Sequence, residues 1–229
     1  MGLPVVRGLG LAALLAIGLA LAACSSYPPP GSKSAAEVVP QVQAAAERAT
    51  SVHVAGTVQT GTQTTTIDVS IQGYSVAGYL GAYGTRFYVL SLNGNSFVKL
   101  NAAYLSLERA PASLCARVCG KYVALNTSGA VQITELLSMQ TLIKEVFNSK
   151  NMTAAAGSGC AFAPATLRGQ SVLQCRQGND ELDVAAQGEP YLVYWRGPHG
   201  QHLAFTDWNS VVLPAAPTAS QIVNLSDLG

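Results

Sequence analysis

The alternation of apolar and polar residues between positions 51 and 100 constrains the fold of this chain more than any other feature. Apolar side chains recur at every second position in two stretches, and their members are Val52, Val54, Val58, Ile67, Val69 and Ile71. A period of two is typical of a β-strand with one buried face. Residues 86–92 are apolar on both sides, which indicates cover on both faces there. With a strong hairpin signal at Asn93-Gly94, the segment predicts an antiparallel meander of about five strands.

A second run of strands and two helices are predicted outside this meander. The strands cover 171–176, 180–186, 191–196 and 201–208, with turn residues between them. A capping box at Ser34 and Glu37 predicts a helix over roughly 35–49. Pro40 lies inside it, so a helix that starts with Pro40 at its first position is the alternative. The strongly apolar residues 133–147 predict another helix, with a wider apolar face than a surface helix needs.

Runs of strands with separate helices indicate the α+β class. A sheet of about ten strongly twisted strands does not stay flat but curls. We therefore expect a strongly curved antiparallel sheet, a half-barrel of about ten strands, with the helices packed on its concave face. An apolar cavity between the sheet and the helices would follow from that arrangement.

The N-terminal residues have the pattern of a lipoprotein signal peptide. Arg7 is followed by an uncharged apolar stretch over 8–20 and then by Leu21-Ala22-Ala23-Cys24. An apolar run that ends in small residues is typical of a secretory signal peptide, and small residues directly before a cysteine form a lipobox, in which the thiol accepts diacylglycerol. An uncleaved transmembrane helix is the alternative, but the run is short for a bilayer, which needs about 20 apolar residues.

Cleavage before Cys24 divides the chain into three parts. We expect a signal peptide over 1–23, a lipidated cysteine with a Pro- and Ser-rich linker over 24–34, and a single domain over 35–229. Two or more acyl chains, palmitate among them, give stable anchoring where one chain does not. The sequence therefore predicts a lipid-anchored protein on the extracytoplasmic face of the cell membrane, in a periplasm-like, oxidising compartment.

Four further cysteines predict two disulfide bonds, because their number is even and the compartment is oxidising. They are Cys115, Cys119, Cys160 and Cys175. Three connectivities are open, and the spacings favour Cys115 with Cys119 and Cys160 with Cys175. The first pair would need a distorted turn, since Cβ atoms one helical turn apart are farther apart than a disulfide allows. The spacings do not fit a zinc site, which needs closely spaced cysteine pairs.

Charge and motifs argue against several classes of function. The 13 basic and 12 acidic residues give a formal net charge of +1, so no basic field for nucleic acid is present. The sequence has no G-x-S-x-G, HExxH or P-loop motif. His199 and His202 lie in a predicted hairpin turn, where exposed histidines are ordinary, and Glu181 and Asp183 are expected on a solvated strand face. We therefore predict no enzyme, no metal and no cofactor.

The chain resembles the LppX/LprG group of actinobacterial lipoproteins, which is related in fold to the LolA/LolB lipoprotein carriers. The resemblance is carried by the lipobox at Cys24, by Ser51-Val52-His53-Val54-Ala55-Gly56 after a short helix, by the Thr- and Gly-rich meander, and by Gly120-Lys121-Tyr122-Val123 before an apolar helix. It implies a half-barrel closed by helices, with a cavity that takes acyl chains of a lipid or lipoglycan in transit through the cell envelope.

Two hypotheses on function follow. The first is a carrier that binds a lipid or glycolipid, with an envelope transporter as a candidate partner. Its cavity candidates lie on the apolar helix and are Ile133, Leu136, Leu137, Ile143, Val146 and Phe147. The second is a non-catalytic anchored interaction or structural lipoprotein, in which the same residues fill a core and no ligand binds. A hydrolase with an unrecognised site is a weaker third hypothesis.

Overall fold

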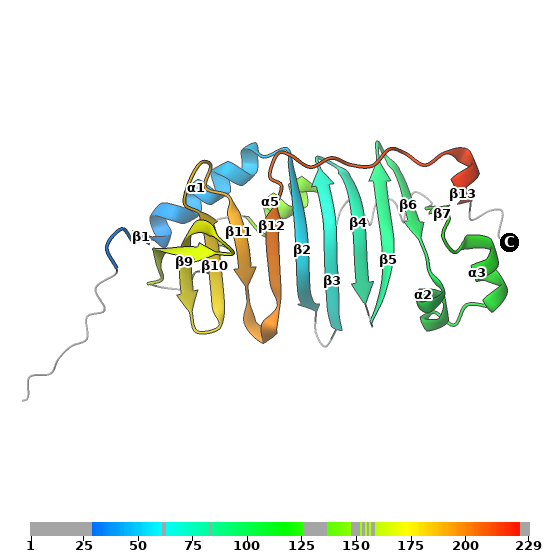
Figure 1. Ribbon diagram of the computed structural model, residues 1–229, viewed down its shortest axis with the longest axis horizontal. Coiled ribbons are helices and arrows are strands. Elements are labelled where there is room, and N and C mark those ends of the chain that lie inside the picture. The colour runs from blue at the N-terminus through cyan, green and yellow to red at the C-terminus, as the bar shows by residue number, and fades with distance from the viewer. Residues whose placement is uncertain are drawn as a thin grey trace, which may run out of the picture.

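A single 13-stranded sheet forms the centre of the molecule (Figure 1). The computed structural model describes residues 29–60, 63–82, 84–125, 137–147, 152, 154, 156 and 159–224. Four α-helices accompany the sheet in these residues, and the sheet is curved but not closed. The predicted α+β class is therefore confirmed.

Two meanders make up most of the sheet. The first contains β2 (Ser51–Thr60), β3 (Gln63–Gln72), β4 (Ser75–Ala82), β5 (Thr85–Leu92), β6 (Asn95–Lys99) and β7 (Tyr122–Ala124). The second contains β8 (Ala161–Leu167), β9 (Gln170–Gln177), β10 (Asp180–Ala185), β11 (Leu192–Arg196) and β12 (His202–Thr206). They join where β12 pairs with β2 in antiparallel register. At the two edges lie β1 (Lys33–Ser34) and β13 (Ile222–Asn224).

Helix α1 (Ala35–Arg48) begins where the local sequence predicts a cap. The Ser34 hydroxyl accepts the backbone N–H of Glu37 at 3.3 Å, so α1 starts at its predicted cap and contains Pro40. The remaining α-helices are α2 (Ala102–Leu107), α3 (Ala112–Val118) and α5 (Met139–Glu145). Short 3₁₀ helices are η1 (Pro198–Gly200) and η2 (Ala219–Gln221).

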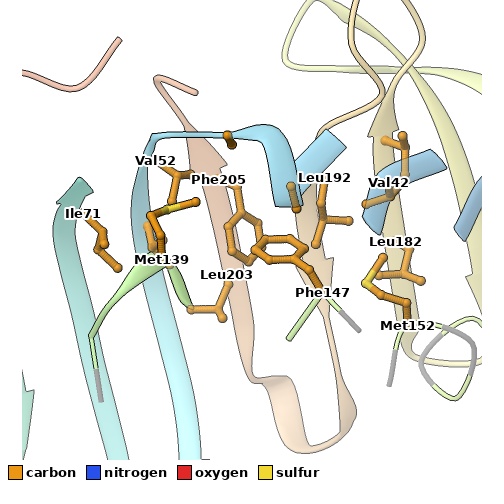
Figure 2. Close-up of a cluster of buried hydrophobic side chains, with 14 of the residues drawn as sticks. Val42, Val52, Ile71, Met139, Phe147, Met152, Leu182, Leu192, Leu203 and Phe205 are labelled. Carbon is orange, nitrogen blue, oxygen red and sulfur yellow. The ribbon is translucent and has the colours of Figure 1, made fainter. Parts of the chain in front are cut away.

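The two faces of the sheet differ in their cover. Buried side chains of α1 and α5 pack with those of β2, β3, β10, β11 and β12 in one cluster (Figure 2), and we call this face the helix side. In Figure 1, α1 and α5 lie behind the sheet, so the reader looks at the opposite face. Side chains alternate between the faces along each strand, as the period of two requires.

The segment between β12 and β13 crosses the molecule along one end of the strands (Figure 1). Leu213 and Ile222 pack against Ala77, Leu90 and Phe97 on the opposite face. Leu90 is therefore as completely buried as its neighbour Val89 on the helix side, which confirms the prediction of cover on both faces of β5. The segment ends in β13, which pairs with β7 in parallel. The sheet is thus mixed, and the expectation of a purely antiparallel sheet is wrong at this edge.

Two glycines lie inside central strands in a conformation that other residues rarely adopt. Gly56 on β2 has φ +152° and Gly78 on β4 has φ +153°. A Cβ at Gly56 would lie 2.1 Å from the carbonyl oxygen of His202, and one at Gly78 would lie 2.2 Å from that of Asp68. A glycine within a strand commonly marks such a close approach of a second backbone.

Candidate functional site

Helix α5 is attached to the hairpin between β3 and β4. The Met139 N–H donates to the Gly73 carbonyl at 3.0 Å, and the Tyr74 hydroxyl donates to Gln140 Oε1 at 2.9 Å. The Met139 side chain lies next to Val52 on the helix side (Figure 2). These contacts fix the start of α5 over the ends of β2 and β3.

Phe147 anchors the end of the same segment. Its side chain is completely buried, and its ring centroid lies 5.3 Å from that of Phe205 and 5.5 Å from that of Trp208. Trp208 in turn donates Nε1–H to the Leu192 carbonyl at 3.1 Å. At this place the helical segment and the sheet meet through side chains, as Figure 2 shows for Phe147, Phe205 and Leu192.

The six cavity candidates from the sequence therefore divide into three groups. Leu137 and Phe147 are buried members of the protein's own core. Ile143 and Val146 are partly buried and pack against that core. Ile133 and Leu136 lie outside the described residues, as does the lipobox cysteine Cys24. None of these positions tests whether a ligand binds, so the assignment of the six residues stays a prediction.

Cover of the helix side decreases along the central strands. The half towards α5 is buried, whereas five apolar residues are only partly buried, four of them in the other half and the fifth, Val98, directly opposite the buried Val89. These residues, which we call the apolar strip, lie on five consecutive strands and are Val58, Ile67, Leu80, Phe87 and Val98. Ile67 pairs directly with Leu80, and Leu80 with Phe87. The sequence patterns did not identify the strip as a binding site, although the alternation that predicted the strands also places these residues on one face.

Both predicted disulfides are present. Cys115 and Cys119 join the last turn of α3 to the residue that caps it, with Cα atoms 4.8 Å apart. Cys160 and Cys175 tie the start of β8 to β9, with Cα atoms 5.8 Å apart. Cys175 is itself a buried member of the main cluster, so this bond fixes the strands at the edge nearest α1.

One solved structure with the same architecture is that of LprF from Mycobacterium bovis. The match has a TM-score of 0.50 at 12% sequence identity and covers 82% of this chain and 100% of that one. LprF is a lipoprotein of the LppX/LprG group. The chain has the LppX/LprG fold. No family model matches the sequence, and no curated protein matches it either. The resemblance found in the sequence is thus confirmed by the fold.

The LppX/LprG fold of this chain buries two carboxylates on the opposite face. Glu181 and Asp183 on β10 are 2% and 0% exposed, so the expectation of a solvated strand face is wrong. Gln174 Nε2 donates to one oxygen of each carboxylate at 2.8 Å. Arg176 lies 2.9 Å and Arg196 2.7 Å from the two oxygens of Glu181. The partners come from β9 and β11, so register between strands, which local sequence does not contain, decides this burial.

Burial raises the pKa of Asp183 from its ordinary 3.8 to about 6, and the neighbouring Glu181 adds to the rise while the Gln174 hydrogen bond opposes it. Oδ2 of Asp183 has no hydrogen-bond partner among the described residues. Because the folded state holds this proton more tightly than the unfolded chain, the contribution of Asp183 to stability is lost as pH rises from about 4 to above 6.

We expect Asp183→Asn to remove this pH dependence, because a neutral amide mimics the protonated carboxyl. The variant should be more stable than the parent chain above pH 7, by on the order of 1–3 kcal/mol, and the difference should vanish below about pH 4. Urea unfolding at several pH values measures it. Asp180→Asn on the same strand is the control and should not reproduce the gain. An equal gain in both variants, or none in Asp183→Asn, would contradict the assignment.

A serine, a histidine and an aspartate also line up on the opposite face. His53 Nδ1 lies 3.0 Å from Ser70 Oγ, and His53 Nε2 lies 3.4 Å from Asp68 Oδ1. In a hydrolase triad the aspartate is buried and orients the histidine. Here the Asp68 side chain is 45% exposed and also pairs with Arg86 at 3.4 Å. Ser70 lies mid-strand between β2 and β4, where backbone N–H groups serve strand pairing, so the array does not favour catalysis.

Among the described residues, no three His, Cys, Asp or Glu side chains gather in a way that could hold a metal ion. Within these residues there is also no helix with the length and apolar character needed to span a bilayer.

Proposed function

We propose that this chain is an anchored extracytoplasmic lipoprotein that binds the acyl chain of a lipid or glycolipid and carries or presents it in the cell envelope. The observation that carries the proposal is the apolar strip. Its five side chains share the helix side of the sheet and are only partly covered by the described residues. Partly exposed apolar side chains in a contiguous row mark a binding surface more often than isolated ones do.

Hydrophobic burial supplies the driving force for such binding. Removal of apolar surface from water contributes about 25 cal/mol per Å², and both the acyl chain and the strip lose such surface in contact. The fold shared with LprF, a lipoprotein, supports the proposal. Ile143 and Val146 face the same core from α5 and extend the surface that we assign to the ligand. An envelope transporter that delivers or receives the lipid is part of the proposal.

The proposal is tested by exchange of one strip residue and its neighbour on the same strand. Ile67→Asn places an amide in the strip, whereas Thr66→Asn makes a similar change at an exposed position on the opposite face. We expect Ile67→Asn to weaken binding of a fluorescent fatty acid about tenfold or more, the equivalent of one buried apolar side chain. Thr66→Asn should bind as the parent chain does.

Two further measurements make the outcome decisive. Leu80→Thr provides a second strip variant in case Ile67→Asn is unstable, and thermal unfolding separates lost binding from lost folding. Native mass spectrometry of protein from an actinobacterial host should show a co-purified lipid. If neither method detects a ligand with the parent chain, the carrier function is wrong.

The alternative function, an anchored interaction or structural lipoprotein without a ligand, is favoured by one observation. Phe147 and Met139 fill the space between their segment and the sheet with side chains. A folded parent chain that binds no lipid would support this second candidate.

A further inference from the structure

The opposite face of the sheet carries three tyrosines and two cations in mutual contact. The rings of Tyr79 and Tyr88 meet edge to face with centroids 5.1 Å apart, and those of Tyr88 and Tyr122 lie 6.3 Å apart. The Arg86 guanidinium lies 4.5 Å from the Tyr79 centroid, and the Lys99 ammonium lies 4.0 Å from the Tyr122 centroid. We call these five residues the tyrosine–cation patch.

Strand register builds the patch from four neighbouring strands. Tyr79 pairs with Tyr88 across β4 and β5, and Tyr88 pairs with Lys99 across β5 and β6. Tyr79 remains 43% exposed and the Arg86 side chain 54% exposed. A second tyrosine–cation pair on the same face, Arg196 beside Tyr194 at 5.9 Å, lies on β11, where Arg196 also pairs with Glu181.

The charge of the patch is positive. Burial raises the pKa of Tyr88, and the nearby Tyr122 and Tyr79 add to the rise, so its phenol stays neutral at physiological pH. Arg86 and Lys99 each carry a positive charge, and the carboxylate at the border, Asp68, is shared between Arg86 and His53. Stacking on a tyrosine orders each cation, and Arg86 has further N–H donors, beyond the one that meets Asp68, with which to bind an anion.

We propose that the tyrosine–cation patch docks the domain onto the anionic phospholipid headgroups of the membrane that holds its anchor. Tyrosines are enriched at membrane–water interfaces, where the ring meets apolar material and the hydroxyl meets water. Lysine and arginine are attracted by anionic lipids at the same depth. The complement of a patch with this composition is therefore a headgroup layer.

Because the anchor would hold the domain close to the membrane, a patch of five residues is sufficient for docking. The inference rests on the anchor at Cys24, which is part of the proposed function, but not on the apolar strip. A short linker between an anchor and its domain gives an effective concentration in the millimolar range, so weak docking becomes populated once the chain is anchored. Docking through the opposite face would turn the helix side, with its apolar strip, away from the bilayer.

Footprinting of the anchored full chain tests the proposal. The chain is placed in nanodiscs of phosphatidylcholine alone or mixed with phosphatidylglycerol, and hydroxyl-radical oxidation of Tyr79, Tyr88 and Tyr122 is measured. We expect oxidation to fall in the mixed discs and to recover near 1 M salt, where the screening length is about 3 Å.

Charge variants separate docking from mere proximity to the membrane. Arg86→Gln and Lys99→Gln should each lower the ratio of docked to undocked protein about fivefold. The matched control is Lys144→Gln, at an exposed position on α5, which should leave the ratio unchanged. The proposal is overturned if the tyrosines are oxidised equally in both kinds of disc, or if their protection does not change with salt concentration. It is also overturned if Lys144→Gln has an effect as large as that of Lys99→Gln. Loss of lipid-carrier activity would not alter this readout, so the two proposals fail separately.

Discussion

Phe147→Ala is expected to lower the free energy of unfolding by about 3–5 kcal/mol, the usual cost of removal of a buried phenyl ring. The ring is completely buried and contacts Phe205 and Trp208, so its loss leaves a cavity lined by aromatic side chains. For a domain of this size, the midpoint of thermal unfolding should fall by about 6–20 °C. Circular dichroism during heating measures the change.

The same variant distinguishes a core role of Phe147 from a role in ligand binding. If it belongs to the core, stability falls and the remaining folded protein binds lipid as before. Leu142→Ala, at a partly buried position on α5, is the matched control with a smaller expected loss of stability. A Phe147→Ala chain that unfolds at the parent temperature but binds lipid more weakly would instead place the residue in a ligand site.

Gly78→Ala and Gly56→Ala are each expected to cost about 3 kcal/mol or more, because strain in the backbone and a clash add together. The new methyl group would lie 2.2 Å from the Asp68 carbonyl oxygen in one variant and 2.1 Å from that of His202 in the other. Both atoms belong to the backbone of a neighbouring strand, so strands rather than side chains must move apart. Urea unfolding should show this as a lower midpoint.

Gly94→Ala separates the two contributions. Gly94 also has a positive φ, of +83°, but a Cβ there would meet nothing within 4 Å. It should cost only about 1 kcal/mol, the strain of a left-handed conformation without a clash. Equal losses in all three variants would show that backbone conformation alone, and not the close approach of strands, explains the two strand glycines.

Local sequence predicted most of the first meander because each signal there is short in range. The Asn93-Gly94 turn has positive φ at both residues, 51° and 83°, as the predicted hairpin requires. The cap at Ser34 likewise depends on a contact three residues away. Spacing along the chain also favoured the two disulfide pairings that the structure contains, among the three that were open.

The sequence did not predict features that depend on contacts between residues far apart in the chain. β13 has three residues and pairs with β7 after a long crossing segment, and so short a strand has no period that a sequence pattern can detect. Glu181 and Asp183 alternate with apolar residues as solvated side chains do, yet cross-strand neighbours bury them. The apolar strip could be placed on one face, but its partial exposure depends on which part of the face the helices cover.

The pairing of β12 with β2 has a consequence for how the protein reaches its folded state. Thr206 pairs with His53, so the seam between the meanders joins residues from nearly opposite ends of the domain. Each meander has mostly local contacts and can form early, whereas closure of such a distant pair is slow. The sheet cannot become continuous until almost the whole polypeptide has been synthesised.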